Sequence, residues 1–322
     1  MFSYKGFFKK ALLLALFFFM LSNPGLSAAC AAEGLKTWYS GVVPVLLPAM
    51  IFTGILVRTN ACEILNPIAA PLFEKVFHLP PQAASAWIVG LLCGYPAGAT
   101  VSGELYRQNK LSEEQTSHLL MFCNYPSPMF LTGLLLTGCL EKQVSPFLFL
   151  PAIYLSGCLT GFFTRDSSAP KAYILRKDKP NPPVEVPKSN GIIIVLEDSL
   201  FAAVRIIVIV GLYIMLFQII AGFATSYLRL PPLILNLLVG SLEMTNGVLL
   251  ASKLSLSLLP KSCLMLAFSV FGGISTYLQS MSALGDAAFL GKRYLAGRLL
   301  HAALAVGLYL LFFFLYLQMR QM

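Results

Sequence analysis

Polar side chains set inside apolar segments are the residues of this chain best suited to chemistry. Asn124, Tyr125 and Ser127 surround Pro126 in one such segment, and a second proline, Pro128, follows directly. Because proline removes a backbone donor and disturbs a helix, carbonyl and amide groups are left free to face a solute. We therefore expect a broken membrane helix with a binding role. The alternative is a kink whose free groups neighbouring helices satisfy.

Glu243 places a charge inside an otherwise apolar segment, beside Thr245 and Asn246. A charged side chain at the bilayer centre costs about 2.5 to 3.5 kcal/mol on insertion scales, so such residues are usually functional. Glu243 is expected to pair with a cation, exchange a proton or hydrogen-bond a solute, with Thr245 and Asn246 completing a polar tip. The alternative is a tip that reaches solvent.

A second broken helix is predicted at the glycine pair Gly272-Gly273. Ser269, Ser275 and Gln279 lie close to it in the sequence. Their polar groups are candidates for solute binding, although small residues also allow helices to approach each other closely.

Two further candidates are Tyr95 and Arg205. Tyr95 and Pro96 interrupt a glycine-rich stretch, so two half-helices there can direct their ends at a cavity. Arg205 is assigned to a membrane span, where it can neutralise an anionic solute or pair with Asp198 or Glu197. Snorkelling of its side chain to the cytoplasmic face is the competing interpretation.

The elements that carry these residues form two matching sets. A short broken segment at about 84–103 precedes a longer broken one at 117–139, and 231–252 precedes 262–283 in the same way. Short, interrupted hydrophobic segments at corresponding positions of two halves are typical of discontinuous helices around a transport site. We expect an inverted-topology repeat with two re-entrant hairpins and alternating access to a site at the bilayer midplane.

The composition supports a helical membrane protein. Hydrophobic residues make up 57% of the 322 positions and charged residues 11%, with a mean hydropathy of +0.76. Such a chain has too little polar surface for a soluble globule. Most apolar runs approach the roughly 20 residues that a spanning helix needs, which predicts an all-α, polytopic fold. Besides the two hairpins, the runs lie at about 7–22, 41–57, 117–139, 144–164, 201–223, 262–283 and 294–318.

The basic residues predict the topology, since Lys and Arg accumulate on cytoplasmic loops. If the first hairpin enters from the cytoplasm and the second from outside, most of them fall inside. Those assigned inside are Lys5, Lys9, Lys10, Arg58, Lys75, Arg107, Lys110, the six of the segment 165–190, Lys292, Arg293 and Arg298; those outside are Lys36, Lys142, Arg229, Lys253, Lys261 and Arg320. The bias favours two hairpins of opposite orientation.

This topology divides the chain into four parts: residues 1–40, with a first helix that is either retained or cleaved as a signal, a first repeat at 41–164, a proline-rich cytoplasmic linker at 165–190, and a second repeat at 191–322. We favour the retained helix.

Other classes of function find little support. The net charge of +9 is dispersed among loops without an aromatic-basic surface, so nucleic acid is not an expected partner. The seven cysteines show no metal-ligand spacing and the three histidines are isolated, so no metal or cofactor is expected. Neither paired aspartates nor a serine and histidine at plausible depth point to an intramembrane enzyme.

The chain resembles the sporulation integral membrane proteins of endospore-forming Firmicutes that carry the nucleoside-recognition or Gate domain. The resemblance covers about residues 7–318 and rests on five motifs in combination: Gly41–Pro48 after Trp38, Gly94–Gly98, Lys110–Glu114, Asn124–Pro128 and Leu242–Gly247. It implies a relation to concentrative nucleoside transporters and an integral protein of the bacterial cell membrane, at the outer forespore membrane.

Within that group, the implied role is transport of dipicolinic acid, a small planar dianion, from the mother cell toward the forespore. A nucleoside-type solute, bound by Asn124, Asn246 and Glu243, is one alternative, although the short Ser-Leu-Glu-Met tip lacks the richer polar signature of a nucleoside site. A non-transporting scaffold that recruits partners through the linker is another. The expected partners are the solute and the lipid bilayer, and a coupling ion and a homo-oligomer are both compatible with this arrangement.

Overall fold

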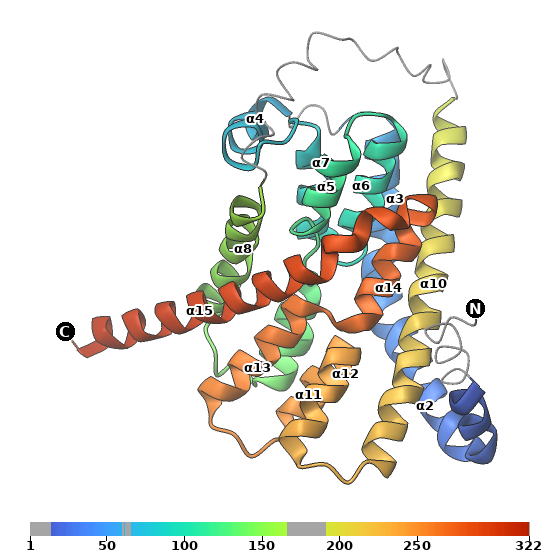
Figure 1. Cartoon of the computed structure of the whole chain (residues 1–322), viewed down its shortest axis with the longest axis vertical. Coiled ribbons are helices and arrows are strands. Elements are labelled where there is room, and N and C mark those ends of the chain that lie inside the picture. The colour runs from blue at the N-terminus through green and yellow to red at the C-terminus, as the bar shows by residue number, and fades with distance from the viewer. Residues whose placement is uncertain (1–13, 60, 62–65, 166–190, 322) are drawn as a thin grey trace, which may run out of the picture.

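The computed structural model describes residues 14–59, 61, 66–165 and 191–321, and this part of the chain folds into helices, turns and loops with no strand (Figure 1). The prediction of an all-helical fold is confirmed. The linker lies outside the described residues except for Arg165, as do the N-terminal lysines.

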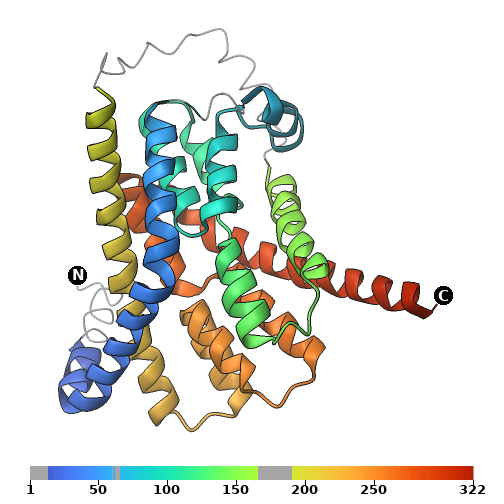
Figure 2. The same cartoon turned by 180° about the vertical axis from the view of Figure 1, so that it is seen from behind.

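A long helical run forms one side of the molecule. A helix at Leu14–Ser22 meets the next at a bend of 105°. From there α2 (Pro24–Thr37), the π-helical η1 (Trp38–Val42) and α3 (Val43–Arg58) follow without a gap. The helix α10 (Ile192–Tyr227) packs along both α2 and α3 (Figure 2). The boundary placed between residues 40 and 41 therefore falls inside a continuous helical run.

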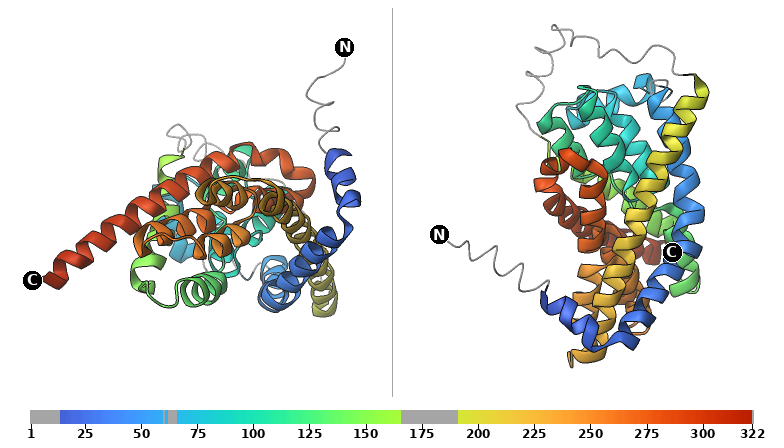
Figure 3. Two further views of the ribbon diagram at one scale, coloured as in Figure 1. Left: turned by 90° about the horizontal axis from the view of Figure 1, so that it is seen from below. Right: turned by 90° about the vertical axis from the view of Figure 1, so that its right-hand side faces the viewer.

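The other helices lie beside α10 and the N-terminal helical run, and the last of them reaches the C-terminal end of the described chain. They are α4 (Asn66–Leu72), η3 (Phe73–Phe77), α5 (Ala83–Cys93), α6 (Ala97–Arg107), α7 (Glu113–Leu120), η4 (Phe130–Cys139), α8 (Pro146–Phe163), α11 (Pro232–Leu242), α12 (Met244–Ser252), α13 (Leu258–Phe271), α14 (Gly273–Leu284), η5 (Gly285–Arg293) and α15 (Tyr294–Gln321). The C-terminal part of α15 projects away from the rest (Figure 3).

Several segments suit a lipid environment. Among the described residues, three are long and apolar enough to cross a membrane, at Pro146–Phe163, Ile193–Tyr227 and Leu258–Met319, and the bent N-terminal pair is a fourth if it counts as one span. Large apolar side chains also face outward, such as Phe201 on α10 at 74% exposure and Met319 on α15 at 77%. Such surfaces are unfavourable in water and are normal against lipid.

Both predicted hairpins fold as two short helices joined at a break. The pair α5 and α6 packs together, as does the pair α11 and α12, and the two pairs lie toward opposite ends of the molecule (Figure 1). Gly247 permits the close approach of α11 and α12, since a Cβ there would lie 2.3 Å from the Cα of Gly240. Their re-entry into a bilayer and the inverted repeat stay predictions.

The breaks in the longer segments also fall where proline and glycine predict them. Residues 121–127 separate α7 from the helix that leads into η4, and Gly272 separates α13 from α14. Gly272 and Gly273 have φ values of 84° and 78°, a conformation that glycine adopts at little cost. The first break lies between two apolar clusters, since Cys123 belongs to one and Tyr125 to the other, and Val270 beside the second break belongs to the same cluster as Tyr125.

Candidate functional site

A buried arginine lies where the broken elements meet. Arg298, in the second turn of α15, is fully buried. Its Nη1 donates to the carbonyl oxygen of Asn124 at 2.5 Å and to Nδ1 of His301 at 3.0 Å. Its Nη2 donates to the Tyr95 hydroxyl at 2.5 Å and to the Val270 carbonyl. The guanidinium fork thus uses four of its five N–H groups, and Nε has no hydrogen-bond partner in the described part of the chain.

These partners come from both halves of the chain. Tyr95 is at the tip of the first hairpin, Asn124 in the first break, and Val270 two residues before the second. The Tyr95 hydroxyl also lies 2.7 Å from the Val270 carbonyl oxygen and 3.2 Å from that of Ser269. Arg298 therefore donates hydrogen bonds to backbone carbonyls beside the breaks of both halves.

No carboxylate in the described part of the chain forms a salt bridge with Arg298. The only salt bridge among the described residues joins Arg107 to Glu104. His301 accepts a hydrogen bond from Arg298 at Nδ1, while its Nε2 lies 2.9 Å from the Ile153 carbonyl oxygen. A neutral ring with its proton on Nε2 satisfies both contacts. Because a buried charge is costly without an opposite charge, the site is suited to an anion.

Asn124 joins α6, the second short helix of the first hairpin, to the first break. It is fully buried, and its Oδ1 accepts from the backbone N–H of Ala99, 3.0 Å away in the first turn of α6. Its Nδ2 lies 3.5 Å from the hydroxyl of Tyr294, to which Ser280 donates at 3.2 Å. The amide side chain is thus engaged on both sides, next to the carbonyl that Arg298 binds.

Glu243 caps a helix. Its Oε1 accepts from the backbone N–H of Thr245 at 3.0 Å and its Oε2 from that of Asn246 at 2.7 Å, at the start of α12. The residue is only 4% exposed, so the alternative of a tip that reaches solvent does not hold in this structure. A Cβ on Gly273 would lie 3.0 Å from the Glu243 backbone nitrogen, so this tip packs directly on the second break.

Two further candidates of the first half adjoin the site through different contacts. Tyr125 is fully buried, accepts a hydrogen bond from Trp87 Nε1 at 2.9 Å, and packs edge to face on the His301 ring with centroids 5.3 Å apart. The Ser127 hydroxyl accepts from the Phe130 N–H at 3.2 Å. Tyr125 therefore supports His301, while Ser127 caps the helix that follows the break.

The remaining candidates of the second half divide into two groups. The Ser269 hydroxyl donates to a carbonyl of its own helix, and Ser275 accepts from Gln279 at 3.0 Å within α14. All three are buried near the second break. The side chains of Thr245 and Asn246 are half-buried at the tip of the second hairpin.

Arg205 lies within an apolar helix of span length, as the sequence suggests, whereas the surroundings of Arg298 differ from those expected. Arg205 lies exposed on α10 and is not among the hydrogen-bond partners of the buried network. Arg298, counted among the cytoplasmic residues, is fully buried within α15 and does not lie in an exposed loop, while its side of the membrane stays a prediction. The charge count assumes that basic residues occupy loops, whereas α15 already begins at Tyr294 and turns Arg298 inward.

Sequence reasoning also missed His301. A signal was available, because Arg298 and His301 are three residues apart in an apolar run and so share one helix face. The cost of an intramembrane charge, applied above to Glu243, applies equally to Arg298.

Comparisons with known proteins point to one family. The Gate family model, described as nucleoside recognition, matches residues 39–229, which include Tyr95 and Asn124. The chain is also similar to the sporulation integral membrane protein YlbJ of Bacillus subtilis (strain 168), with 26% identity over 328 aligned positions, covering 91% of this chain and 80% of the relative. No solved structure matches.

Proposed function

This chain belongs to the Gate family of nucleoside recognition proteins, and on that premise we propose that it carries a small anionic, heteroaromatic solute across the membrane, with dipicolinic acid as the solute. It is an integral membrane protein whose family and sporulation relative fit a transporter-like role. We place it in the outer forespore membrane, where it would move its solute from the mother cell during sporulation, and we assign it no enzymatic activity.

The observation that carries this proposal is the uncompensated charge of Arg298. Dipicolinate is a small planar dianion, and a planar guanidinium is well matched to carboxylate oxygens. In this conformation backbone carbonyls and neutral side chains occupy the guanidinium fork. We infer that a carboxylate replaces some of these weaker acceptors when the solute binds, which neutralises the buried charge.

Movement of the two halves is the proposed route across the membrane. Tyr95 and Asn124 come from the first half, and Val270 and Arg298 from the second. If a solute carboxylate takes over contacts that now join the halves, the halves can rock about the site and open it to one side at a time.

The nucleoside alternative finds less support. It relies on Asn124, Asn246 and Glu243 as hydrogen-bonding groups. Asn124 Oδ1 and both oxygens of Glu243 already accept backbone N–H groups, so a nucleoside would have to displace helix caps. The scaffold alternative relies on the linker, which lies outside the described residues apart from Arg165.

Flux measurements on the purified protein in liposomes test the proposal. Uptake of labelled dipicolinate, uridine and adenosine is compared between the wild type and Arg298→Gln, with Arg293→Gln as a matched control because Arg293 is an exposed arginine outside the buried network. Monodisperse elution of each variant verifies folding.

We expect dipicolinate flux without nucleoside flux, a loss of at least about tenfold in Arg298→Gln, as for a lost charge-assisted contact, and wild-type flux in Arg293→Gln. Nucleoside flux without dipicolinate flux, or no flux of any solute, would overturn the proposal.

A further inference from the structure

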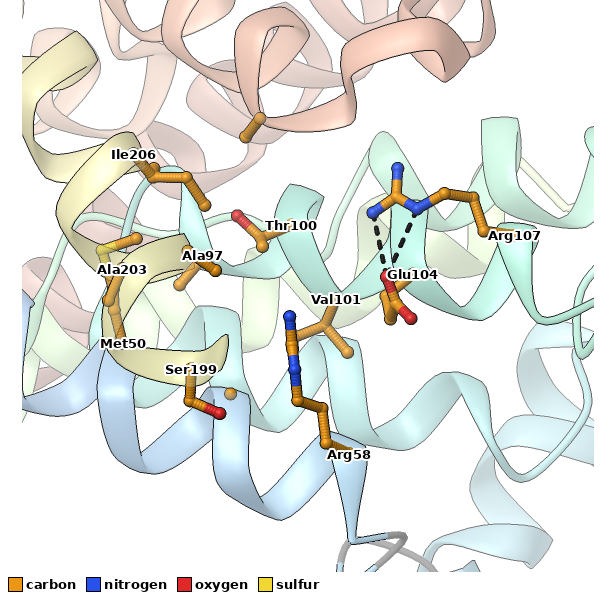
Figure 4. A pocket seen from close by; sticks show the side chains of 13 residues that line it. Met50, Arg58, Ala97, Thr100, Val101, Glu104, Arg107, Ser199, Ala203 and Ile206 are labelled. Atoms are coloured by element: carbon orange, nitrogen blue, oxygen red, sulfur yellow. Dashed lines mark hydrogen bonds and ion pairs between the residues drawn. The ribbon is translucent and has the colours of Figure 1, made fainter. Parts of the chain in front are cut away.

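A cavity distinct from the Arg298 network lies between α3, α6, α10 and α14 (Figure 4). Its volume is about 140 Å³. Pockets for drug-sized ligands measure about 300 to 1,000 Å³, so this one suits only a smaller molecule. A small solute therefore fits the cavity better than the acyl chain of a lipid.

The cavity carries an excess of positive charge. Arg58, Arg107 and Glu104 are the charged residues that line it. Glu104 is paired with Arg107, because its Oε2 lies 3.1 Å from Nη2 of Arg107. The second carboxylate oxygen of Glu104, Oε1, accepts a hydrogen bond from Nε2 of Gln108 at 2.9 Å. In Figure 4 the Arg107 side chain turns to Glu104. Arg58 forms no salt bridge within the described ranges, but its charge also acts on the Glu104 carboxylate, so the cavity holds two cations for one carboxylate.

The walls around Arg58 are apolar with two hydroxyl groups. Ala97, Val101 and Ile206 supply apolar surface, and Thr100 and Ser199 supply the hydroxyls. The Thr100 hydroxyl donates to the Pro96 carbonyl and the Ser199 hydroxyl to that of Val195, so both retain acceptor lone pairs only. A cation beside apolar walls fits the carboxylate of a small, largely apolar anion, which would bind through Arg58 and not through the hydroxyls.

The cavity adjoins the first hairpin, whose tip reaches the Arg298 network. Ala97 lines it and follows Tyr95 by two residues, and the Tyr95 hydroxyl binds Arg298. Both Arg58 and Arg107 are assigned to the cytoplasmic side by the charge pattern. The cavity thus lies between the predicted cytoplasmic surface and the first hairpin tip.

We propose that this cavity is an access site in which Arg58 binds a carboxylate group of a small aromatic anion on the cytoplasmic side, before the anion reaches Arg298. This inference rests on the proposed function. It adds a second cation, an ordered route and a sidedness that the Arg298 network alone does not provide.

Protection of an introduced thiol tests the site without requiring transport. Ala202 lines the cavity from α10 and is half-buried, so Ala202→Cys places a thiol at the site. Its alkylation is followed by mass spectrometry in phosphatidylcholine nanodiscs, with dipicolinate or its neutral diamide added. Ala283→Cys, on the α14 wall, is the second probe if the first variant fails to fold.

Dipicolinate is expected to slow alkylation, and the diamide is not. Arg58→Gln should raise the half-protecting dipicolinate concentration about fivefold, as for a partly solvated ion pair, whereas the exposed Arg293→Gln should leave it unchanged. Equal protection by the diamide, or unaltered protection in Arg58→Gln, would overturn the inference. Protection by phosphatidylglycerol in place of dipicolinate would also overturn it, as it identifies a lipid headgroup site.

The two proposals fail in different ways. Protection that depends on Arg58 but comes without flux supports binding of the anion at Arg58 and contradicts transport. Flux of dipicolinate without protection supports transport and contradicts the access site.

Discussion

Arg298 is a charge held by neutral acceptors. Four of its N–H groups bind two carbonyl oxygens, a phenol and an imidazole nitrogen, all of them buried. Such a set orients a guanidinium without neutralising it, which differs from the usual arrangement of a buried ion pair. The arrangement keeps a positive potential at the point where the broken helices meet.

His301 is expected to hold Arg298 in place. Replacement by Leu removes the acceptor of one Arg298 N–H and the contact to the Ile153 carbonyl, which should lower the free energy of unfolding by about 1 to 3 kcal/mol. His301→Gln should lower the free energy of unfolding by less, because the Gln amide can accept a hydrogen bond from Arg298 and donate one to the Ile153 carbonyl. Thermal unfolding of the purified variants measures both, and equal stability of Leu and Gln variants would argue against this role.

Glu243 is expected to stabilise the protein as the N-cap of α12. Glu243→Gln keeps the shape but offers one acceptor oxygen where two backbone N–H groups now bind the carboxylate. The cost should be about 0.5 to 2 kcal/mol, while flux per folded molecule stays near that of the wild type. Thermal unfolding and liposome flux, measured on the same preparation, separate the two effects. Loss of flux at unchanged stability would instead assign Glu243 to coupling with an ion or proton.

Close helix contact within the second hairpin depends on Gly247. Gly247→Ala places a methyl group against the Gly240 backbone and should destabilise the protein by about 1 to 3 kcal/mol. Gly307→Ala is the matched control, since Gly307 is exposed on α15 with nothing within 4 Å of its Cβ position. Thermal unfolding should show a lower midpoint for Gly247→Ala only; equal midpoints would mean that α11 and α12 do not pack as described.

The breaks were predictable from the sequence because proline and glycine act locally. Pro126 and the pair Gly272-Gly273 mark interruptions through backbone chemistry alone, and the structure has a break at both places. The role of Glu243 was harder to predict, because a charge in an apolar run signals only that it needs a partner. The partners are the N–H groups of its own next turn.

The convergence on Arg298 could not be read from the sequence. Tyr95 and Arg298 lie 203 positions apart, and nothing local in either segment encodes their contact. The same limit applies to the cavity, whose wall combines α3 and α6 with α10 and α14. Interactions between the two halves depend on how the complete chain packs.

The predicted topology places the segments that follow the two hairpins on opposite sides of the membrane. Glu113 and Ser255 are both exposed and follow the first and second hairpin respectively. In intact cells a membrane-impermeant thiol reagent should label Ser255→Cys and leave Glu113→Cys unlabelled until the cells are permeabilised. Labelling of both from the same side would contradict the inverted repeat.

Counterflow through purified protein tests the central claim, that this chain is a carrier of a small anion around Arg298. Liposomes loaded with unlabelled dipicolinate are diluted into a trace of labelled dipicolinate, and internal label is followed over time. We predict a transient accumulation of label above equilibrium with the wild type and Arg293→Gln, and its absence with Arg298→Gln. Entry of label at the same rate in liposomes with and without the protein would contradict the account.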